Sequence, residues 1–381
     1  MKKICICTTA SVTQKCFVLP TVKYLSECCD YEITLVCAPD DAFAAQVPAG
    51  IRFKPVPMAR GIDLRAVRSV AELTRFFRRE KFDMVQYSTP NASLYASVAA
   101  RLARVPIRLY CQWGIRYTGM HGMARRVFKQ LEKLTCALST DIRSVSPLNR
   151  QFAVTEGLYP DGKATVVGNG GTVGVDMSEY AIAEKSAWSA ETRKRLGLGE
   201  NDFVFGFSGR ISRDKGSEEL IRAFRRFDAG AVRLVIIGKI DDHSDVDPGL
   251  TEFLKTSPRV VCTGWVDNRE MKRYYAAMDV LVHPTYREGF GMVIQEAGAL
   301  GVPCITTRII GASEVMTEGE SCLLVEPKDA DGLYDAMNRL YGDSRLTEAL
   351  GAAAYRRTKA LYERSIMLEN LRKDYAGLLG E

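Results

Sequence analysis

The sequence lacks long apolar runs, low-complexity tracts and any CxxC motif with a second one as its mate. Its apolar runs, such as residues 234–237 and 280–282, are far below the ~18 residues that cross a bilayer, so no transmembrane helix is expected. With 46% hydrophobic and 26% charged residues, the chain has the composition of a folded, soluble protein and not of a disordered one.

The eleven cysteines are odd in number and irregularly spaced, and several lie inside apolar runs. This pattern predicts reduced, mostly buried thiols in a cytoplasmic protein rather than a disulfide framework. The start, Met1-Lys2-Lys3 followed by an apolar stretch, superficially resembles a signal peptide, but the stretch ends at Thr8 without a convincing cleavage site. We expect a first β-strand there instead.

The 381 residues are enough for two or three domains, and their charge is uneven. Residues 1–180 contain 24 Lys and Arg against 15 Asp and Glu, whereas residues 181–381 contain 28 against 31. The basic half is therefore expected to bind something anionic. Nucleic acid, an anionic membrane surface and a phosphorylated substrate all satisfy this expectation.

Short apolar runs rich in β-branched residues alternate with helical patterns along the chain, as in βαβ units on a parallel sheet. The expected strands are residues 4–7, 32–37, 84–87, 107–110, 142–145, 203–207, 234–237, 260–262, 280–282 and 304–306. We predict an α/β protein with two Rossmann-like, doubly wound parallel-sheet domains. In such folds ligands bind at the carboxyl ends of the strands, so the cleft that the two domains face is the expected site.

The expected domain boundaries follow from changes in composition. Residues 1–180 form the first domain and residues 181–361 the second, with a polar seam at about 177–201. A last helix begins near residue 362, and residues 362–381 are expected to pack back on the first domain.

The most informative segment is YREGFGMVIQEA, residues 286–297. Glycines keep the backbone non-helical up to about Met292, and a helix follows until Gly301 and Pro303 end it. Glu288 then precedes the helix N-terminus, and Glu296 lies in its first turns. Free N–H groups at a helix N-terminus bind anions such as a diphosphate, and ionised carboxylates accept hydrogen bonds from sugar hydroxyls.

Two further segments support an anion site in the second domain. After the strand at 203–207, Gly209, Arg210 and Lys215 belong to a strand-to-helix loop, where two cations can neutralise a leaving diphosphate without a metal. The segment TGWVD, residues 263–267, again ends a strand with a glycine. Its backbone could hold a nucleobase, although an ordinary turn explains it equally well.

The order GRISRDKG, TGWVD and YREGFGMVIQEA resembles the retaining family 4 glycosyltransferases of the GT-B fold, over most of residues 200–330. Glu288 and Glu296 match the E-x7-E motif of that family. The resemblance implies that Glu288 contacts the donor sugar, that Glu296 binds the ribose and that Arg210 and Lys215 bind the diphosphate. It assigns backbone contacts with sugar and phosphate to Gly289, Phe290, Gly291, Met292 and Val293, and contacts with the base to Gly264, Trp265 and Val266.

The same resemblance implies an enzyme that retains the anomeric configuration. Retention without an obvious carboxylate nucleophile indicates that the acceptor hydroxyl attacks on the face from which the diphosphate departs, and that the leaving phosphate accepts the proton. No metal and no other cofactor is expected, and the donor is expected to be a UDP-sugar carrying a hexosyl or N-acetylhexosaminyl group. The pair Asp245 and Asp247 matches a metal-binding DxD motif, but it lies inside a polar loop and not at a strand end.

The first domain departs from the family. Residues 8–14 contain no glycine, where many relatives have a Gly-Gly loop, and Trp113 occupies the expected place of a histidine. No histidine is therefore assigned a catalytic role, and His121 is a candidate only by proximity. We expect Trp113, Arg116 and His121 to lie near the acceptor.

Residues 123–138 read as an amphipathic, basic helix. Its predicted apolar face carries Val127, Leu131, Leu134 and Leu138, and its cations are Arg125, Arg126, Lys129 and Lys133, opposed by Glu132. A second basic cluster comprises Arg65, Arg68, Arg75, Arg78, Arg79 and Lys81.

Similarity to bacterial capsule and O-antigen transferases implies an acceptor on a polyprenyl diphosphate at the inner membrane face. We therefore expect a cytoplasmic, peripheral enzyme of surface polysaccharide synthesis that binds anionic lipid and no nucleic acid. Three alternatives stay open. They are a transferase with a soluble acceptor, a sugar-nucleotide epimerase of the same fold, and a nucleic-acid-binding protein, for which no recognised module is present.

Overall fold

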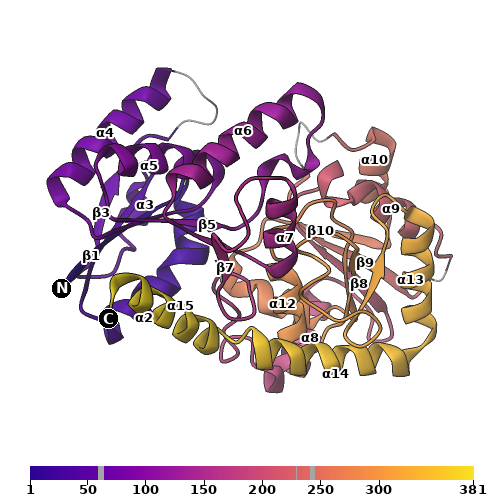
Figure 1. The fold of residues 1–381 in the computed structure, drawn as a ribbon. Helices are drawn as coiled ribbons and strands as arrows, with labels where there is room; N and C mark the ends of the chain where they lie inside the picture. The colour runs from indigo at the N-terminus through magenta and orange to yellow at the C-terminus, as the bar shows by residue number, and fades with distance from the viewer. Residues whose placement is uncertain (59–63, 229, 241–244) are drawn as a thin grey trace. The chain divides into compact units, whose positions relative to one another are not determined.

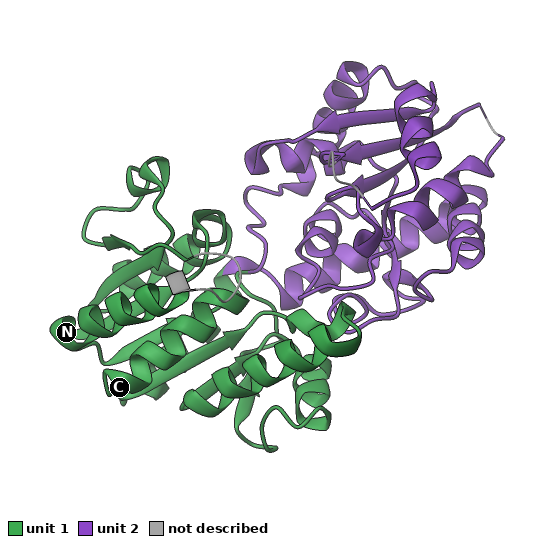
Figure 2. Cartoon of the chain, turned by 90° about the horizontal axis from the view of Figure 1, so that it is seen from above, with its two compact units in different colours: residues 1–173, 365–381 green, residues 174–364 purple. Residues whose placement is uncertain are grey.

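The computed structural model describes residues 1–58, 64–228, 230–240 and 245–381. It divides into two compact units (Figure 2): residues 1–173 with 365–381, and residues 174–364. The division therefore falls several residues before the predicted boundary at 180/181, and just after the predicted one at 361/362.

The first unit is built on a parallel sheet with the strand order β3-β2-β1-β4-β5-β6-β7. Its strands are β1 (Lys2–Cys7), β2 (Tyr31–Cys37), β3 (Arg52–Pro55), β4 (Met84–Tyr87), β5 (Ile107–Gln112), β6 (Asp141–Ser144) and β7 (Ala164–Val166). Most of these strands are apolar on both sides, as expected where helices cover both faces of a parallel sheet.

Helices cover both faces of this sheet. They are α1 (Ser11–Thr13), a π-helical turn (Gln14–Val18), α2 (Leu19–Cys28), α3 (Asp41–Ala44), α4 (Leu64–Glu80), α5 (Pro90–Leu102), α6 (Gly122–Leu138), α7 (Pro147–Thr155) and α15 (Arg364–Leu379). One core layer is formed with α4 and α5, and the other with α2 and α15.

The C-terminal helix α15 lies beside α2 (Figure 1), and polar contacts fix it to the first unit. Tyr24 donates a hydrogen bond of 2.9 Å to Glu369. Arg143 of β6 contacts both carboxylate oxygens of Asp374, at 2.8 and 2.9 Å from its Nε. These contacts explain why a helix that follows the second unit in sequence belongs to the first unit in space.

The second unit has a parallel sheet with the order β10-β9-β8-β11-β12-β13. Its strands are β8 (Phe203–Ser208), β9 (Val232–Ile237), β10 (Val260–Gly264), β11 (Val280–His283), β12 (Cys304–Thr307) and β13 (Cys322–Val325). Its helices are α8 (Lys185–Arg195), α9 (Ser217–Arg225), α10 (Pro248–Thr256), α11 (Met271–Ala276), α12 (Met292–Ala299), α13 (Ala330–Gly342) and α14 (Ser344–Leu361).

The predicted α/β architecture with two Rossmann-like parallel sheets is confirmed, and each predicted strand has a counterpart. Within the predicted seam at 177–201, residues 185–195 form helix α8, whose Arg193 binds Asp279 at 2.8 Å within the second unit. Three short edge strands, β3, β7 and β13, were not predicted. Edge strands pair on one side and are short, so their sequence pattern is weak.

Candidate active site

Three ionisable side chains of the second unit meet at the carboxyl ends of neighbouring strands. Glu288 follows β11, Lys215 follows β8, and their Nζ and Oε2 atoms are 2.8 Å apart. His283, the last residue of β11, places Nε2 3.0 Å from the same Oε2. Because an ionised carboxylate only accepts hydrogen bonds, this contact requires the His283 proton on Nε2.

The charge on Glu288 is fixed by these partners. Burial raises the pKa of Glu288, but the hydrogen bond from His283 and the positive charge of Lys215 outweigh it and hold the pKa well below its usual range. The side chains of Lys215 and Glu288 are both 20% exposed, so the pair remains open to a ligand. Glu288 is thus held ionised beside Lys215 and His283, in a cluster that solvent partly reaches.

Close packing of two loops brings this cluster together. Gly216 has a φ of +67°, and a Cβ atom there would lie 1.9 Å from the carbonyl oxygen of Pro284. Tyr286 also donates its backbone N–H to the carbonyl of Asp214 at 2.9 Å. Only glycine permits this approach, which sets Lys215 against Glu288.

The glycine loop from Gly289 to Gly291 leads directly into α12. Gly291 precedes the helix with a φ of +44°, and the ring of Phe290 points away into the unit, 5.6 Å from that of Tyr362. Gln295 fixes the loop by donating to the carbonyl of Phe290 at 3.1 Å. The loop therefore leaves backbone, not side chain, beside Glu288, and the first turn of α12, with Met292 and Val293, provides the N-terminal end of a helix dipole.

Glu296 lies in the second turn of α12 in a different environment. Its Oε2 accepts a hydrogen bond of 2.9 Å from the hydroxyl of Tyr275. Burial raises the pKa of Glu296 to about 7, and hydrogen bonds from Tyr275 and Tyr180 with the charge of Arg364 offset this only in part. Glu296 is thus poised near neutral pH, which makes its charge sensitive to any donor that binds it.

Arg210 is largely exposed at the end of β8. It follows Gly209, and its guanidinium is 65% exposed and 3.6 Å from Asp214. The backbone of Gly209 approaches Gly238 so closely that a Cβ atom on Gly238 would lie 1.9 Å from the carbonyl oxygen of Gly209. Arg210 is therefore carried on a fixed backbone while its side chain remains available.

The third predicted segment ends β10. Gly264 has a φ of +69° and accepts a backbone hydrogen bond of 2.9 Å from Gly238. Val266 is partly buried, whereas the Trp265 side chain is 69% exposed. The three predicted segments thus follow β8, β10 and β11 at one edge of one sheet, as the sequence indicated.

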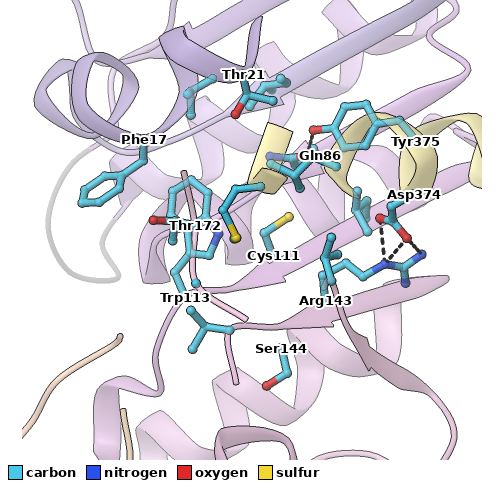
Figure 3. Close-up of a pocket in the computed structure, with 18 residues that line it drawn as sticks. Phe17, Thr21, Gln86, Cys111, Trp113, Arg143, Ser144, Thr172, Asp374 and Tyr375 are labelled. Atoms are coloured by element: carbon cyan, nitrogen blue, oxygen red, sulfur yellow. Dashed lines mark hydrogen bonds and ion pairs between the residues drawn. The ribbon is translucent and has the colours of Figure 1, made fainter. Parts of the chain in front are cut away.

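In the first unit, the predicted acceptor residues do not converge. Trp113 packs on Phe17, with ring centroids 5.7 Å apart, and lines a pocket of about 40 Å³ (Figure 3). Figure 3 shows the pair of Arg143 and Asp374 on the other side of this pocket, with Cys111 between. Trp113 therefore belongs to the sheet face that α2 and α15 cover.

Arg116 and His121 lie elsewhere in the first unit. The guanidinium of Arg116 stacks over the ring of Phe128 of α6, 4.3 Å from its centroid, and lines a second pocket between α5 and α6. His121 is exposed directly before α6. The sequence predicted that these three residues lie in one acceptor loop. In the structure, Trp113 and Arg116 line two different pockets, and His121 lies at an exposed helix end.

The predicted faces of α6 are wrong. Val127 and Leu134 are 46% and 43% exposed, and Glu132, expected among the cations, is 8% exposed. Glu132 is buried because Tyr110 and Gln112 each donate a hydrogen bond of 2.7 Å to it. The outward face of α6 is therefore apolar in part.

Asp245 and Asp247 of the DxD motif accept hydrogen bonds from backbone N–H groups and, among the residues that the structure describes, do not join other acidic side chains in a cluster. Asp245 accepts from the N–H of Arg213 at 2.8 Å, and Asp247 caps α10 through Gly249 at 2.7 Å. Within the described parts of the chain, no three or more His, Cys, Asp or Glu side chains gather as a metal site would require. Nor does any helix of these parts have the length and apolar content to cross a bilayer.

Sequence reasoning missed His283, Tyr275 and Tyr180. His283 could have been noticed as a polar residue at the end of an apolar strand, five positions before Glu288. The two tyrosines come from segments distant in sequence from Glu296, so only the fold brings them together.

Comparisons with known proteins identify the family to which the chain belongs. Residues 189–357 match the model "Glycosyl transferases group 1", and residues 18–170 match "Glycosyl transferase 4-like domain". The capsular polysaccharide biosynthesis glycosyltransferase CapM of Staphylococcus aureus is 32% identical over 86% of this chain and 85% of its own length. An Escherichia coli UDP-Gal:alpha-D-GlcNAc-diphosphoundecaprenol alpha-1,3-galactosyltransferase is 26% identical over 83% of this chain and 81% of its own.

Solved structures agree on the fold. HepE of Anabaena, in complex with UDP-glucose, superposes with a TM-score of 0.81 at 19% identity and covers 99% of this chain and 100% of its own. Identity at this level supports the fold alone, whereas the relationship to CapM extends over most of both sequences. The chain therefore belongs to the GT-B glycosyltransferases, with a group 1 domain formed by the part of the chain that carries Lys215, Glu288 and Glu296.

Proposed function

We propose that the enzyme transfers a hexosyl or N-acetylhexosaminyl group from a UDP-sugar to a sugar on a polyprenyl diphosphate, with retention and without a metal, in capsule or O-antigen synthesis. The observation that carries the proposal is the cluster of Lys215, His283 and Glu288 beside the glycine loop. Diphosphate leaving groups need positive charge, and sugar hydroxyls need acceptors. The name of the Escherichia coli relative supports the donor class and the lipid-linked acceptor, and the name of CapM supports a role in capsule synthesis.

In the proposed reaction, the bond from the anomeric carbon to the diphosphate oxygen breaks while the acceptor oxygen bonds to the same carbon on the same face. The acceptor proton passes to the leaving phosphate oxygen. Lys215, Arg210 and the N-terminus of α12 stabilise the charge that develops there. Glu288, held by Lys215 and His283, accepts hydrogen bonds from the donor sugar, and Glu296 accepts them from the ribose.

One assay tests the donor and the chemistry together. UDP-, GDP- and ADP-sugars are offered with an acceptor sugar on a short prenyl diphosphate, and the released nucleotide and the anomeric configuration of the product are measured. We expect UDP release that requires the acceptor, a retained configuration, and full activity in EDTA. Activity that EDTA abolishes and Mg²⁺ restores would contradict the metal-independent mechanism.

The same assay distinguishes the alternatives. An epimerase would produce an epimeric sugar or free UDP with no acceptor present. A transferase with a soluble acceptor would be equally active on the acceptor sugar without its lipid diphosphate. Either result would overturn the proposed substrate pair.

The proposed membrane association rests on α6, as corrected by the structure. Arg125 and Lys129 are both bound to Glu156, at 2.8 and 2.9 Å, whereas Arg126 and Lys133 are exposed. Exposed cations beside exposed apolar residues are typical of helices that lie in a membrane interface. The proposed surface is therefore the exposed side of α6.

Sedimentation with vesicles tests this surface. Binding should require anionic phosphatidylglycerol and fall with salt. Replacing both Arg126 and Lys133 by Gln should weaken binding more than replacing Arg125 and Lys129, the matched control, whose charges Glu156 partly neutralises. Equal binding to neutral vesicles, or equal effects of the two pairs, would overturn the role of this face.

A further inference from the structure

A pocket of about 170 Å³ lies between α5 and α6 of the first unit. Its wall is mostly apolar and is formed by Pro90, Leu94, Tyr95, Val127, Phe128 and Leu131. An apolar cavity of roughly 150 Å³ holds a molecule the size of benzene. The pocket therefore has room for about one isoprene unit of five carbons.

Glu132 also lines the pocket, and its carboxyl group contacts two neutral side chains, Tyr110 and Gln112. Burial raises the pKa of Glu132, and the hydrogen bonds from Gln112 and Tyr110 offset this only in part. The nearby cation is Arg116, whose guanidinium lies over the Phe128 ring and within 3.4 Å of Asn91. A mostly apolar wall beside the guanidinium of Arg116 is complementary to an apolar chain that ends in an anion.

The pocket is continuous with an apolar strip on the outside of α6. Met123, Val127 and Leu134 are 69%, 46% and 43% exposed, and helical spacing puts them on one side of α6. Val127 belongs both to this strip and to the pocket wall. The exposed cations Arg126 and Lys133 lie on the same outward side, so an anionic lipid surface matches the strip in both polarity and charge.

We infer that the α5–α6 pocket binds the first isoprene unit of the lipid-linked acceptor, with Arg116 contacting its diphosphate and the rest of the chain following the α6 strip into the bilayer. This inference rests on the proposed function and deepens it, because it assigns the lipid part of the acceptor to named residues. It requires that affinity depend on the chain nearest the diphosphate, and not on the sugar alone.

Filling the pocket tests the inference. Leu94→Trp adds an indole to a partly buried wall position, and Val127→Gln makes the exposed wall polar without touching the core. Val67→Trp, at a 66% exposed position of α4, is the matched control. Each variant is assayed with the same acceptor sugar on farnesyl diphosphate and on methyl diphosphate.

For the wild type we expect a KM about tenfold or more lower with the farnesyl than with the methyl acceptor. Leu94→Trp and Val127→Gln should each raise the KM for the farnesyl acceptor about tenfold and leave the KM for the methyl acceptor unchanged. The control Val67→Trp should change neither KM. Equal KM values for the two acceptors in the wild type would overturn the inference. So would a variant that changes both KM values alike while its melting temperature stays normal.

A binding measurement keeps this test independent of catalysis. Fluorescent dansyl-farnesyl diphosphate should bind the wild type, be displaced by farnesyl diphosphate, and bind Leu94→Trp at least tenfold more weakly. Displacement by phosphatidylglycerol as efficient as by farnesyl diphosphate would assign the pocket to bilayer lipid and overturn the inference. If no lipid-linked acceptor is a substrate, the proposed function fails, while the dansyl probe still decides whether the pocket takes a prenyl chain.

Discussion

Glu288 in the second unit and Glu132 in the first are both largely enclosed carboxyl groups, yet their surroundings give them opposite charge behaviour. Glu288 contacts Lys215 and His283, and its pKa is held well below its usual range after these contacts outweigh burial. Glu132 is hydrogen-bonded by Gln112 and Tyr110, both neutral, and burial raises its pKa.

The difference shows that the partners of a buried acid, more than its depth, decide the direction in which its pKa shifts. The second unit maintains charge at the strand ends, where an ionic donor is proposed to bind. In the first unit, burial disfavours the charged form of Glu132 in the pocket beside α6, where a lipid is proposed to bind. The predictions below test this contrast, from the largest expected effect to the smallest.

Lys215→Ala should have the largest effect. It leaves Glu288 without its cation and removes a charge-assisted contact with the donor diphosphate, worth about 1.5–3 kcal/mol. We expect kcat/KM to fall about 100-fold or more and the free energy of unfolding to fall by about 3 kcal/mol. Nucleotide-release kinetics and urea unfolding measure both.

The matched control for Lys215→Ala is Arg226→Ala, which removes a 45% exposed cation bound to Asp331 on the surface of the same unit. It should change neither quantity by much. Near-normal turnover of Lys215→Ala would rule out the diphosphate role.

Glu288→Gln should lower kcat about 100-fold with little effect on nucleotide affinity, because the proposed contact is with the reacting sugar. The substitution should also change how the free energy of unfolding depends on pH in the acid range. A depressed pKa stabilises the fold above the unfolded pKa of about 4.3, and this contribution is lost as the pH falls below it. Unfolding measured from pH 3 to 6 should therefore be less acid-sensitive in the variant. A pure loss of nucleotide affinity would mean that Glu288 and Glu296 have exchanged roles.

Glu296 should make the free energy of unfolding fall as the pH rises from about 4.5 to 7. Because burial raises its pKa to about 7, the folded state binds a proton that the unfolded state has released in this window. Protonated Glu296 makes its full contribution to the free energy of unfolding below the unfolded pKa, and this contribution is lost as the pH rises through 7. Glu296→Gln should remove about 3 kcal/mol of this dependence and weaken UDP binding. Denaturant unfolding at several pH values checks it, with the exposed Glu252→Gln as control; parallel curves for wild type and Glu296→Gln would contradict the assignment.

Glu132→Gln should have the smallest effect, below about 1 kcal/mol in unfolding. A neutral amide keeps an acceptor oxygen for Tyr110 and Gln112, and burial already disfavours the charged form of the acid that it replaces. Thermal and denaturant unfolding measure the change. A loss as large as that of Glu288→Gln in the same assays would erase the contrast between the two acids.

The sequence predicted the second unit better than the first for a physical reason. Positions of Lys215, Glu288 and Glu296 follow from local glycines, strand ends and one short helix, which nearby residues determine. The contacts of His283 with Glu288 and of Tyr275 with Glu296 form only when the folded sheet brings these segments together. In the first unit, the pattern of α6 indicated an amphipathic helix, but the neutral partners of Glu132 lie on β5, so its burial and the exposure of Val127 could not be read from the helix alone.

The most direct test of the contrast is two-substrate kinetics on the intact enzyme, with donor and farnesyl-diphosphate-linked acceptor varied independently. Lys215→Ala should change the donor KM and kcat and leave the acceptor KM within about twofold. Leu94→Trp should raise the acceptor KM about tenfold and leave the donor KM unchanged. If both variants change the same constant, or if Leu94→Trp changes neither, the division between a charged donor unit and an apolar acceptor unit is wrong.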